Sequence, residues 1–186
     1  MNNFVMSRQP LLNRQSRIIA TRLTLHLGTA ASMQDAAAAL GALDDVWPRS
    51  EKPIFVNCGH TDYNAGLLDW TPPENATIEL PAASLVGPNG PDLISALQTW
   101  QPTVCLNFDP EAAQALSSGV PFRFIGFDAQ RFTLEQLKLL AARTKTYGMG
   151  VAFNVASTQD FLACLDAGIT SASGWFFTSP TSVPAT

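Results

Sequence analysis

Short apolar runs alternate with longer amphipathic patterns along most of the chain. Two apolar segments, at residues 4–6 and 18–25, lie on either side of a polar cluster at residues 13–16, which predicts a β-hairpin. A helix is expected at residues 33–43, because Ser32 can cap the first turn of an alanine-rich stretch. The chain is therefore predicted to open with a hairpin followed by a helix.

Strands and helices are predicted to alternate through the rest of the chain. Apolar runs rich in β-branched side chains predict strands at residues 54–56, 77–80, 104–106, 122–127 and 151–153. Helical patterns lie between them, at residues 91–100, 110–116, 134–147 and 158–166. Strands that are apolar on successive residues are covered on both faces, so the alternation predicts a mostly parallel sheet, either closed into a barrel or open and doubly wound. A complete eight-unit barrel typically needs about 250 residues, so with 186 residues a barrel would have to be trimmed.

Charge and cysteine content narrow the function classes. The chain has 11 basic and 15 acidic residues, a net charge of −4, which disfavours binding to a nucleic-acid polymer. The three cysteines, Cys58, Cys105 and Cys164, are widely spaced and form no CxxC pair, so buried reduced thiols are expected instead of disulfides or a zinc site. Neither a signal sequence nor an apolar run of about 18 residues is present, which predicts a soluble cytoplasmic protein with no membrane span.

Familiar catalytic motifs are absent. No GxGxxG or GxxxxGK[ST] phosphate loop occurs, and no serine lies in a GxSxG motif. His60 lies near Cys58 and Asp62 and could gather a metal with them, although His60 as a cap for a helix near Thr61 is the alternative. The neighbouring acids Asp44 and Asp45 are interpreted as a solvated turn.

Polar side chains follow the predicted strands at their carboxyl ends, namely Asn57, Glu79, Asn107, Asp128 and Asn154. In parallel α/β architectures ligands bind at these ends, so the five side chains would converge on one mouth. Asn and Asp are also common turn formers, so both interpretations remain open.

Three segments resemble EAL–HDOD signalling proteins, in which a cyclic di-GMP phosphodiesterase-type barrel precedes an HDOD domain. FVMSRQPLL at residues 4–12, with RIIA at 17–20, resembles the family's opening "RQPI-x-D … I-x-A-Y-E-L-L-F-R". FVNC at 55–58 resembles "V-N-F-S", and SGWFFTSP at 173–180 resembles "Q-G-Y-F-F-x-x-P". The resemblance implies an α/β fold, a trimmed and modified TIM-type (β/α) barrel with an antiparallel first strand. Residues 1–180 would be a degenerate EAL-like domain, and residues 181–186 a tail or the start of a linker.

Active members of this family resemble two-metal phosphodiesterases, and the chain departs from their pattern. Only Asn57 and Glu79 match ligand positions, whereas Arg22 stands where the family has its naming glutamate. A guanidinium repels a metal ion instead of binding it. Arg22 is therefore expected to pair with Glu79 and fill the vacated site.

The remaining family positions also differ. Asn107 and Phe108 fall at the aspartate pair, although a shift of one residue would bring Asp109 nearer. Gly126 replaces a lysine that precedes Asp128, Phe153 replaces a glutamate and Ser173 replaces a glutamine. The resemblance thus implies a vestigial site at the barrel mouth, formed by Arg22, Asn57, Glu79, Asn107, Phe108, Gly126, Asp128, Phe153 and Ser173. No catalytic residue, no metal and no cofactor is expected there.

Three functions follow from these patterns. The first is an inactive EAL-like domain that acts as a regulatory or protein-interaction module for a protein partner of unknown identity and does not bind cyclic di-GMP; Trp47, Trp70 and Trp100 are candidate contacts. The second is a cyclic di-GMP receptor that does not cleave its ligand, with Arg22 or Arg123 at the phosphates and an aromatic ring on guanine. The third is an enzyme of unrelated chemistry built from Asn57, Glu79 and Asp128.

Overall fold

The computed structural model describes residues 4–59, 62–174 and 181–183. Its first two strands, β1 (Val5–Leu12) and β2 (Ile18–His26), form the predicted antiparallel hairpin. In their register, Gln9 is opposite Arg22 and Leu11 is opposite Ala20. Cross-strand partners point to the same face of a sheet, so this register decides which side chains of the hairpin enter the barrel.

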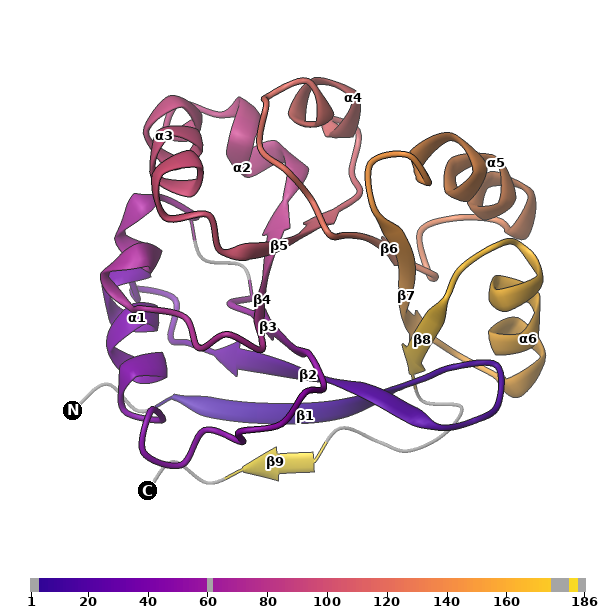
Figure 1. Ribbon diagram of the computed structural model, residues 1–186, viewed down its shortest axis with the longest axis horizontal. Coiled ribbons are helices and arrows are strands. Elements are labelled where there is room, and N and C mark those ends of the chain that lie inside the picture. Colours follow the sequence, from indigo (N-terminus) through magenta and orange to yellow (C-terminus); the bar gives the residue numbers. More distant parts are fainter. Residues whose placement is uncertain (1–3, 60–61, 175–180, 184–186) are drawn as a thin grey trace.

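Strands and helices alternate along the rest of the chain (Figure 1), and the predicted elements are present with small differences at their ends. The strands are β3 (Ile54–Asn57), β4 (Ala76–Pro81), β5 (Thr103–Asn107), β6 (Phe124–Asp128), β7 (Met149–Val155) and β8 (Ser171–Gly174). The helices are α1 (Met33–Gly41), η1 (Ala65–Asp69), α2 (Ala82–Val86), α3 (Gly90–Trp100), α4 (Ala112–Leu116), α5 (Leu134–Thr144) and α6 (Thr158–Asp166).

The strands close into an eight-stranded mixed barrel, and this decides between the closed and the open sheet. Strands β2 to β8 run parallel to one another in sequence order. Strand β1 is antiparallel to both β2 and β8, and it joins β8 through the pair Leu12 and Ala172. The predicted antiparallel first strand is therefore confirmed. Helices α1 to α6 lie around the ring of strands except along β1, as Figure 1 shows.

Two apolar regions stabilise this arrangement. The larger lies between the barrel and its helices and includes Leu40, Leu80 and Leu97. The smaller fills the barrel interior and consists of Leu11, Ala20, Phe55, Cys105, Phe124, Val151 and Phe153. This second set, called the interior plug below, separates the two ends of the barrel.

Two strands were not predicted. Strand β8 consists of two serines, an alanine and a glycine, so it carries no apolar signal. Residues Thr181–Val183, expected in a tail or linker, form a short strand β9 that pairs antiparallel with β1 at Met6, Ser7 and Arg8. Residues 175–180, which carry most of the closing family motif, lie outside the described residues.

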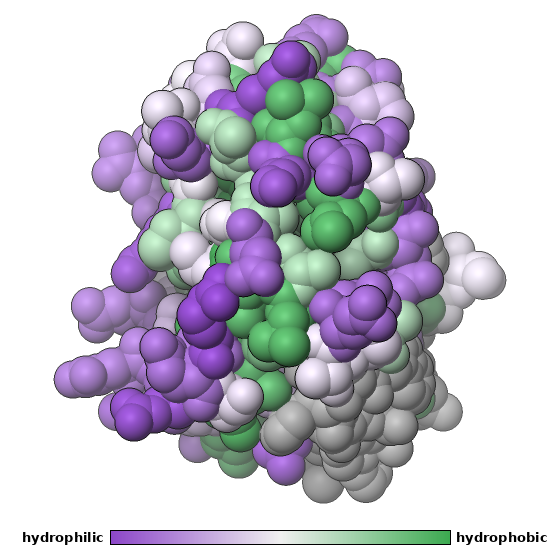
Figure 2. All heavy atoms as spheres, turned by 90° about the vertical axis from the view of Figure 1, so that its right-hand side faces the viewer, coloured by the Kyte–Doolittle hydropathy of each residue, from purple (hydrophilic) through white to green (hydrophobic). Residues whose placement is uncertain are grey.

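The cysteine prediction is confirmed, since Cys58, Cys105 and Cys164 are all buried free thiols. None of the described helices is both long and apolar enough to cross a membrane. Figure 2 shows the face that α5 and α6 cover, where a band of apolar residues runs between polar ones. Leu139 of α5 and Leu162 of α6 are about half exposed, at 52% and 48%.

Candidate functional site

The carboxylate of Glu79 lies at the centre of a hydrogen-bonded network near the carboxyl ends of the strands. It is on β4 and fully buried. Four hydrogen bonds reach its two oxygens, two from Arg22 and one each from Asn57 and Asn107. Three of them end on Oε1 and one on Oε2, so Arg22 and the two asparagines take up most of the acceptor capacity of the carboxylate.

Arg22 on β2 binds Glu79 with both arms of its guanidinium. Its Nε donates to Oε2 and its Nη2 donates to Oε1, each at 2.8 Å. The Cζ atom also lies 4.0 Å from the centroid of the Phe153 ring, a cation–π contact. Burial alone would lower the pKa of Arg22, but the charge of Glu79 and the hydrogen bonds to it outweigh burial and raise that pKa. The predicted ion pair is therefore present.

Two asparagines complete the network. Asn57 at the end of β3 donates its amide to Glu79 Oε1 at 3.1 Å and accepts from the backbone of Gly59 at 2.8 Å. Asn107 at the end of β5 donates to the same oxygen at 2.9 Å. Each amide thus points its nitrogen at the carboxylate.

Gly126 on β6 leaves the space that the network occupies. A Cβ at this position would lie 2.8 Å from Phe153 Cε2 and would also collide with Asn107 Oδ1. A lysine at residue 126 is therefore incompatible with the positions of Asn107 and Phe153. The residues at 107, 126 and 153 fit one another.

Three residues that were candidates from the sequence take other roles. Phe108 packs between the barrel and its helices, against Phe127 and Phe132, with ring centroids 5.4 and 6.0 Å apart. Asp128 accepts from the backbone of Gln130 at 3.0 Å and lies 3.6 Å from Arg131. Its side chain is thus held by its own loop.

Asp109, considered as an alternative ligand, caps a helix instead. Its Oδ2 accepts from the backbone of Ala83 in the first turn of α2, and its Oδ1 accepts from the backbone of Glu111, each at 2.8 Å. Asn154 at the end of β7 has a positive φ of 58°, as expected for an asparagine at a turn. Its carbonyl accepts from Gln130 at 2.8 Å.

Ser173 on β8 is fully buried, and its Oγ has no hydrogen-bond partner. Its neighbour Ala172 belongs to the apolar region beneath the helices. Because side chains alternate along a strand, Ser173 faces the barrel interior, as Phe153 does.

The wall of the site beside Glu79 is formed by buried groups that stay neutral. The Tyr63 hydroxyl accepts from the backbone of Cys58 at 3.1 Å. Burial, with the charge of Glu79, raises the pKa of the Cys58 thiol to about 12. Burial also raises the pKa values of Tyr63 and Cys105 well above their ordinary range. All three groups are therefore protonated and uncharged at neutral pH.

The residues present do not fit the two-metal centre that the family resemblance implies. Glu79 already accepts four hydrogen bonds, and the Arg22 guanidinium binds both of its oxygens. Among the described residues, no three His, Cys, Asp or Glu side chains are grouped so that they could hold a metal ion. Asp62 is exposed, whereas His60 and Thr61, the proposed ligand and helix start, lie outside the described residues. Asp44, in the turn predicted to be solvated, accepts a hydrogen bond from the Trp70 indole N–H at 3.1 Å.

The hairpin adds residues that sequence reasoning missed. Gln9 is opposite Arg22 in the register and is buried, so its side chain shares the interior face. Ser7 and His26 lie further along the same face, with Oγ and Nε2 sharing a hydrogen bond at 2.9 Å. Their position depends on the register between the two strands, and the sequence does not give this register because the length of the turn is not evident from it.

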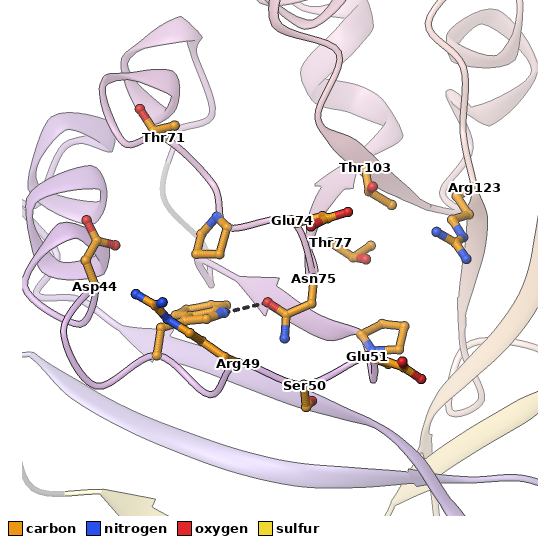
Figure 3. A pocket seen from close by; sticks show the side chains of 13 residues that line it. Asp44, Arg49, Ser50, Glu51, Thr71, Glu74, Asn75, Thr77, Thr103 and Arg123 are labelled. Carbon is orange, nitrogen blue, oxygen red and sulfur yellow. Dashed lines mark hydrogen bonds between the residues drawn. The ribbon is translucent and has the colours of Figure 1, made fainter.

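Arg123, the other candidate phosphate ligand, lies at the opposite end of the barrel. It directly precedes β6 and lines a hollow of about 820 Å³ at the amino-terminal ends of the strands. Figure 3 shows it near Thr77 and Thr103. Since Arg22 faces the other end, beyond the interior plug, the two arginines do not belong to one site.

The chain is similar in fold to solved structures, whereas comparisons of its sequence with family models and curated proteins find no match. Among solved structures, an EAL domain protein from Listeria monocytogenes EGD-e has a TM-score of 0.69 and 15% identity, over 96% of this chain and 89% of that one. The FimX EAL domain from Pseudomonas aeruginosa, bound to c-di-GMP, has a TM-score of 0.66 and 17% identity, over 96% and 91%.

A longer protein is also similar. Klebsiella pneumoniae BlrP1, in a complex with calcium and cyclic di-GMP, has a TM-score of 0.71 and 13% identity, with 97% of this chain covered. This chain spans 56% of that protein. The TM-scores show that the folds are similar, and at identities this low the similarity concerns the fold alone. The chain has the barrel fold of the EAL domains.

Proposed function

We propose that the chain is a catalytically inactive EAL-like domain that acts as a regulatory or protein-interaction module in signal transduction. In this proposal it does not hydrolyse cyclic di-GMP, holds no metal and recognises a protein partner. The observation that carries the proposal is that Arg22, Asn57 and Asn107 donate four hydrogen bonds to Glu79, with the Arg22 guanidinium bound to both of its oxygens. Two-metal hydrolysis needs several free oxygen ligands and an activated water.

The neighbours of Glu79 support the same conclusion. Phe153 places an aromatic face against the guanidinium, and Gly126 leaves no side chain at the position of the family lysine. Asp128 and Asp109 are held by their own loops and by α2. The mouth thus holds an ion pair with no net charge, and the barrel that surrounds it is complete.

The alternative is that the domain binds cyclic di-GMP without cleaving it. Several proteins of this fold were solved in complexes with that nucleotide. In this chain, Arg22 would have to leave Glu79 to reach a phosphate, which would strand a buried carboxylate and cost several kcal/mol.

Isothermal titration with cyclic di-GMP, in magnesium, in calcium and in EDTA, tests both proposals when the products are assayed in the same samples. We expect no binding heat and no linear dinucleotide. Metal-dependent hydrolysis would refute the inactive domain. Binding without products would establish the receptor, and the variants Arg22→Gln and Arg123→Gln would locate it, since they remove one guanidinium from each end of the barrel.

A further inference from the structure

The amino-terminal end of the barrel carries a groove formed by two adjoining hollows. The larger, about 820 Å³, extends from Trp47 and Arg49 to Arg123. The smaller, about 320 Å³, extends from Leu68 and Trp70 to Trp100. The hollows share four lining residues, Thr71, Pro73, Glu74 and Thr103, so they form one continuous surface, called the amino-end groove below. The interior plug separates it from the Arg22–Glu79 pair.

The groove is open along its length. Nine of its lining residues are exposed, namely Asp44, Arg49, Ser50, Glu51, Thr71, Glu74, Trp100, Gln101 and Arg123. Figure 3 shows the larger hollow from close by, with side chains from several loops around it. Small-molecule sites enclose about 70–90% of their ligand, which this groove does not do. An extended chain lying along it fits better.

One end of the groove is aromatic and rigid. Trp100, the last residue of α3, is 70% exposed, unlike Trp47 and Trp70, which are 7% and 3% exposed. The prolines at 72, 73 and 102 line the same hollow. Proline fixes its backbone φ, so these walls lose little entropy on binding. An exposed tryptophan on a rigid wall is typical of the residues that dominate the energy of an interface.

Charge defines the middle of the groove. The larger hollow carries both signs, since Asp44, Glu51, Arg49 and Arg123 line it. Glu74 lies where the two hollows meet and, among the described residues, is the one charged residue that lines the smaller hollow beside Trp100. Within the described part of the chain, neither Glu51 nor Glu74 forms an ion pair. The domain also has a net charge of −4, so its long-range field favours a basic partner.

We propose that the amino-end groove binds an extended, proline-containing segment of a partner protein that carries a basic residue. The proline rings would pack on Trp100 and on the proline walls, because polyproline helices are preformed and dock on aromatic-lined grooves. The basic side chain would pair with Glu74. This inference rests on the proposed role as a protein-interaction module and gives that role a surface and a ligand chemistry.

The test uses blocked synthetic peptides of equal length and the full chain. The first peptide is a proline repeat ending in a pair of arginines, the second replaces the arginines with glutamates, and the third replaces the prolines with glycine and serine. Binding is followed by tryptophan fluorescence and by the NMR signals of the indole N–H groups. We expect only the first peptide to bind and to shift the Trp100 indole signal.

Variants then locate the site. Trp100→Ala should weaken binding about tenfold, as for a typical interface hot spot, whereas Trp100→Phe should retain most of it. Glu74→Gln should weaken binding roughly threefold and reduce its dependence on salt, since a screened surface pair is removed. Leu139→Ala on α5 is the matched control and should change nothing, because it also removes an exposed apolar side chain from a helix.

Several outcomes would overturn the proposal. These are the absence of binding by the first peptide, equal binding by the glutamate peptide, or binding that Trp100→Ala leaves intact. A nucleotide assay on the same preparations separates this failure from that of the proposed function. Hydrolysis of cyclic di-GMP would refute inactivity and leave the peptide result standing, whereas an inactive chain that binds no peptide would refute the groove alone.

Discussion

The Arg22 guanidinium and the Glu79 carboxylate depend on each other. Glu79 is fully buried and the Arg22 side chain is 14% exposed, so each charge has lost most of its water. A buried ion pair can contribute little net stability, but removal of one partner leaves an uncompensated charge and typically costs about 3–5 kcal/mol. The pair is therefore structural.

Replacement of Arg22 by methionine should lower the free energy of unfolding by about 3–5 kcal/mol, because Glu79 then lies buried without a cation. The double variant Arg22→Met with Glu79→Gln should recover much of this loss, since no charge remains. Urea unfolding followed by circular dichroism measures both. Additive effects of the two single changes would contradict a coupled pair.

Gly126→Ala should destabilise the domain by about 1–3 kcal/mol, because the new methyl group meets Phe153 and Asn107. The Asn107 amide cannot move away freely, since it is bonded to Glu79. Gly41→Ala in the last turn of α1 is the control: a Cβ there has nothing within 4 Å, so alanine should leave the stability unchanged or raise it by up to about 1 kcal/mol. Equal unfolding midpoints for the two variants would show that residue 126 has spare room.

At this scale the sequence predicted contacts between strands better than the direction of strand-end side chains. The Arg22–Glu79 pair was predicted between neighbouring strand ends; the pair is present, but β3 lies between the two strands. Phe108 and Asp128 were placed at the same mouth, but one packs outward against Phe127 and the other turns to its loop. A side chain at the end of a strand is free to take either direction, and local hydrogen bonds decide between them.

Capping explains why the helices begin where the sequence predicts. Ser32 accepts from the backbone of Asp35 at 3.2 Å, and Thr133 accepts from the backbone of Gln136 at 3.2 Å. In both cases the backbone N–H of the cap residue donates in turn to the side-chain oxygen of the residue three positions later, at 2.8 Å. These reciprocal pairs are readable from sequence as S/T-x-x-D/E/Q patterns.

Thr133→Ala should lower the free energy of unfolding by about 1 kcal/mol, since it removes the cap of α5. Thr133→Ser keeps the hydroxyl and should cost only a few tenths of that. Thermal unfolding of both variants measures the difference. The interpretation fails if alanine and serine are equivalent, because the hydroxyl would then contribute nothing.

Elements without an apolar pattern were missed. Strand β8 has small and polar residues because its interior positions are Ser171 and Ser173. The short helix α2 follows β4 directly at Pro81, so no turn separates the two patterns in sequence. Periodicity predicts elements that bury large side chains, and it cannot predict those that are held by their neighbours.

At the scale of the molecule, closure of the barrel could not be predicted from periodicity, because open and closed sheets share the same alternation of elements. The β8–β1 join fixes it, through Leu12 and Ala172. The family resemblance supplied what the pattern lacked, and the barrel with its antiparallel first strand is confirmed. The amino-end groove was not predicted, since its residues come from loops that are far apart in the sequence.

Stability should fall in alkaline solution. The pKa of Cys58 is about 12 in the folded chain, against 9.0 in an exposed thiol. Below about pH 9 the thiol is protonated in both states, so its contribution to stability is complete there. Between about pH 9 and pH 12 only the unfolded thiol ionises, and the free energy of unfolding falls by up to about 1.4 kcal/mol per pH unit.

Urea unfolding at about pH 8 and about pH 11 measures this decrease. The Cys58→Ala variant should show a shallower decrease, whereas Tyr63 and Cys105, whose pKa values are also raised, keep part of it. Identical decreases in the variant and the parent chain would mean that Cys58 ionises equally in both states.

The fit between residues 22, 107, 126 and 153 makes the mouth hard to convert by single substitutions. An acid at residue 22 alone would face Glu79 with no cation between them, and a lysine at 126 alone would collide with Phe153 and Asn107. Each single step toward a metal-binding mouth is destabilising, so several changes would have to occur together. Single substitutions at the mouth are therefore expected to be selected against, whereas substitutions on the outer surface should be tolerated more easily.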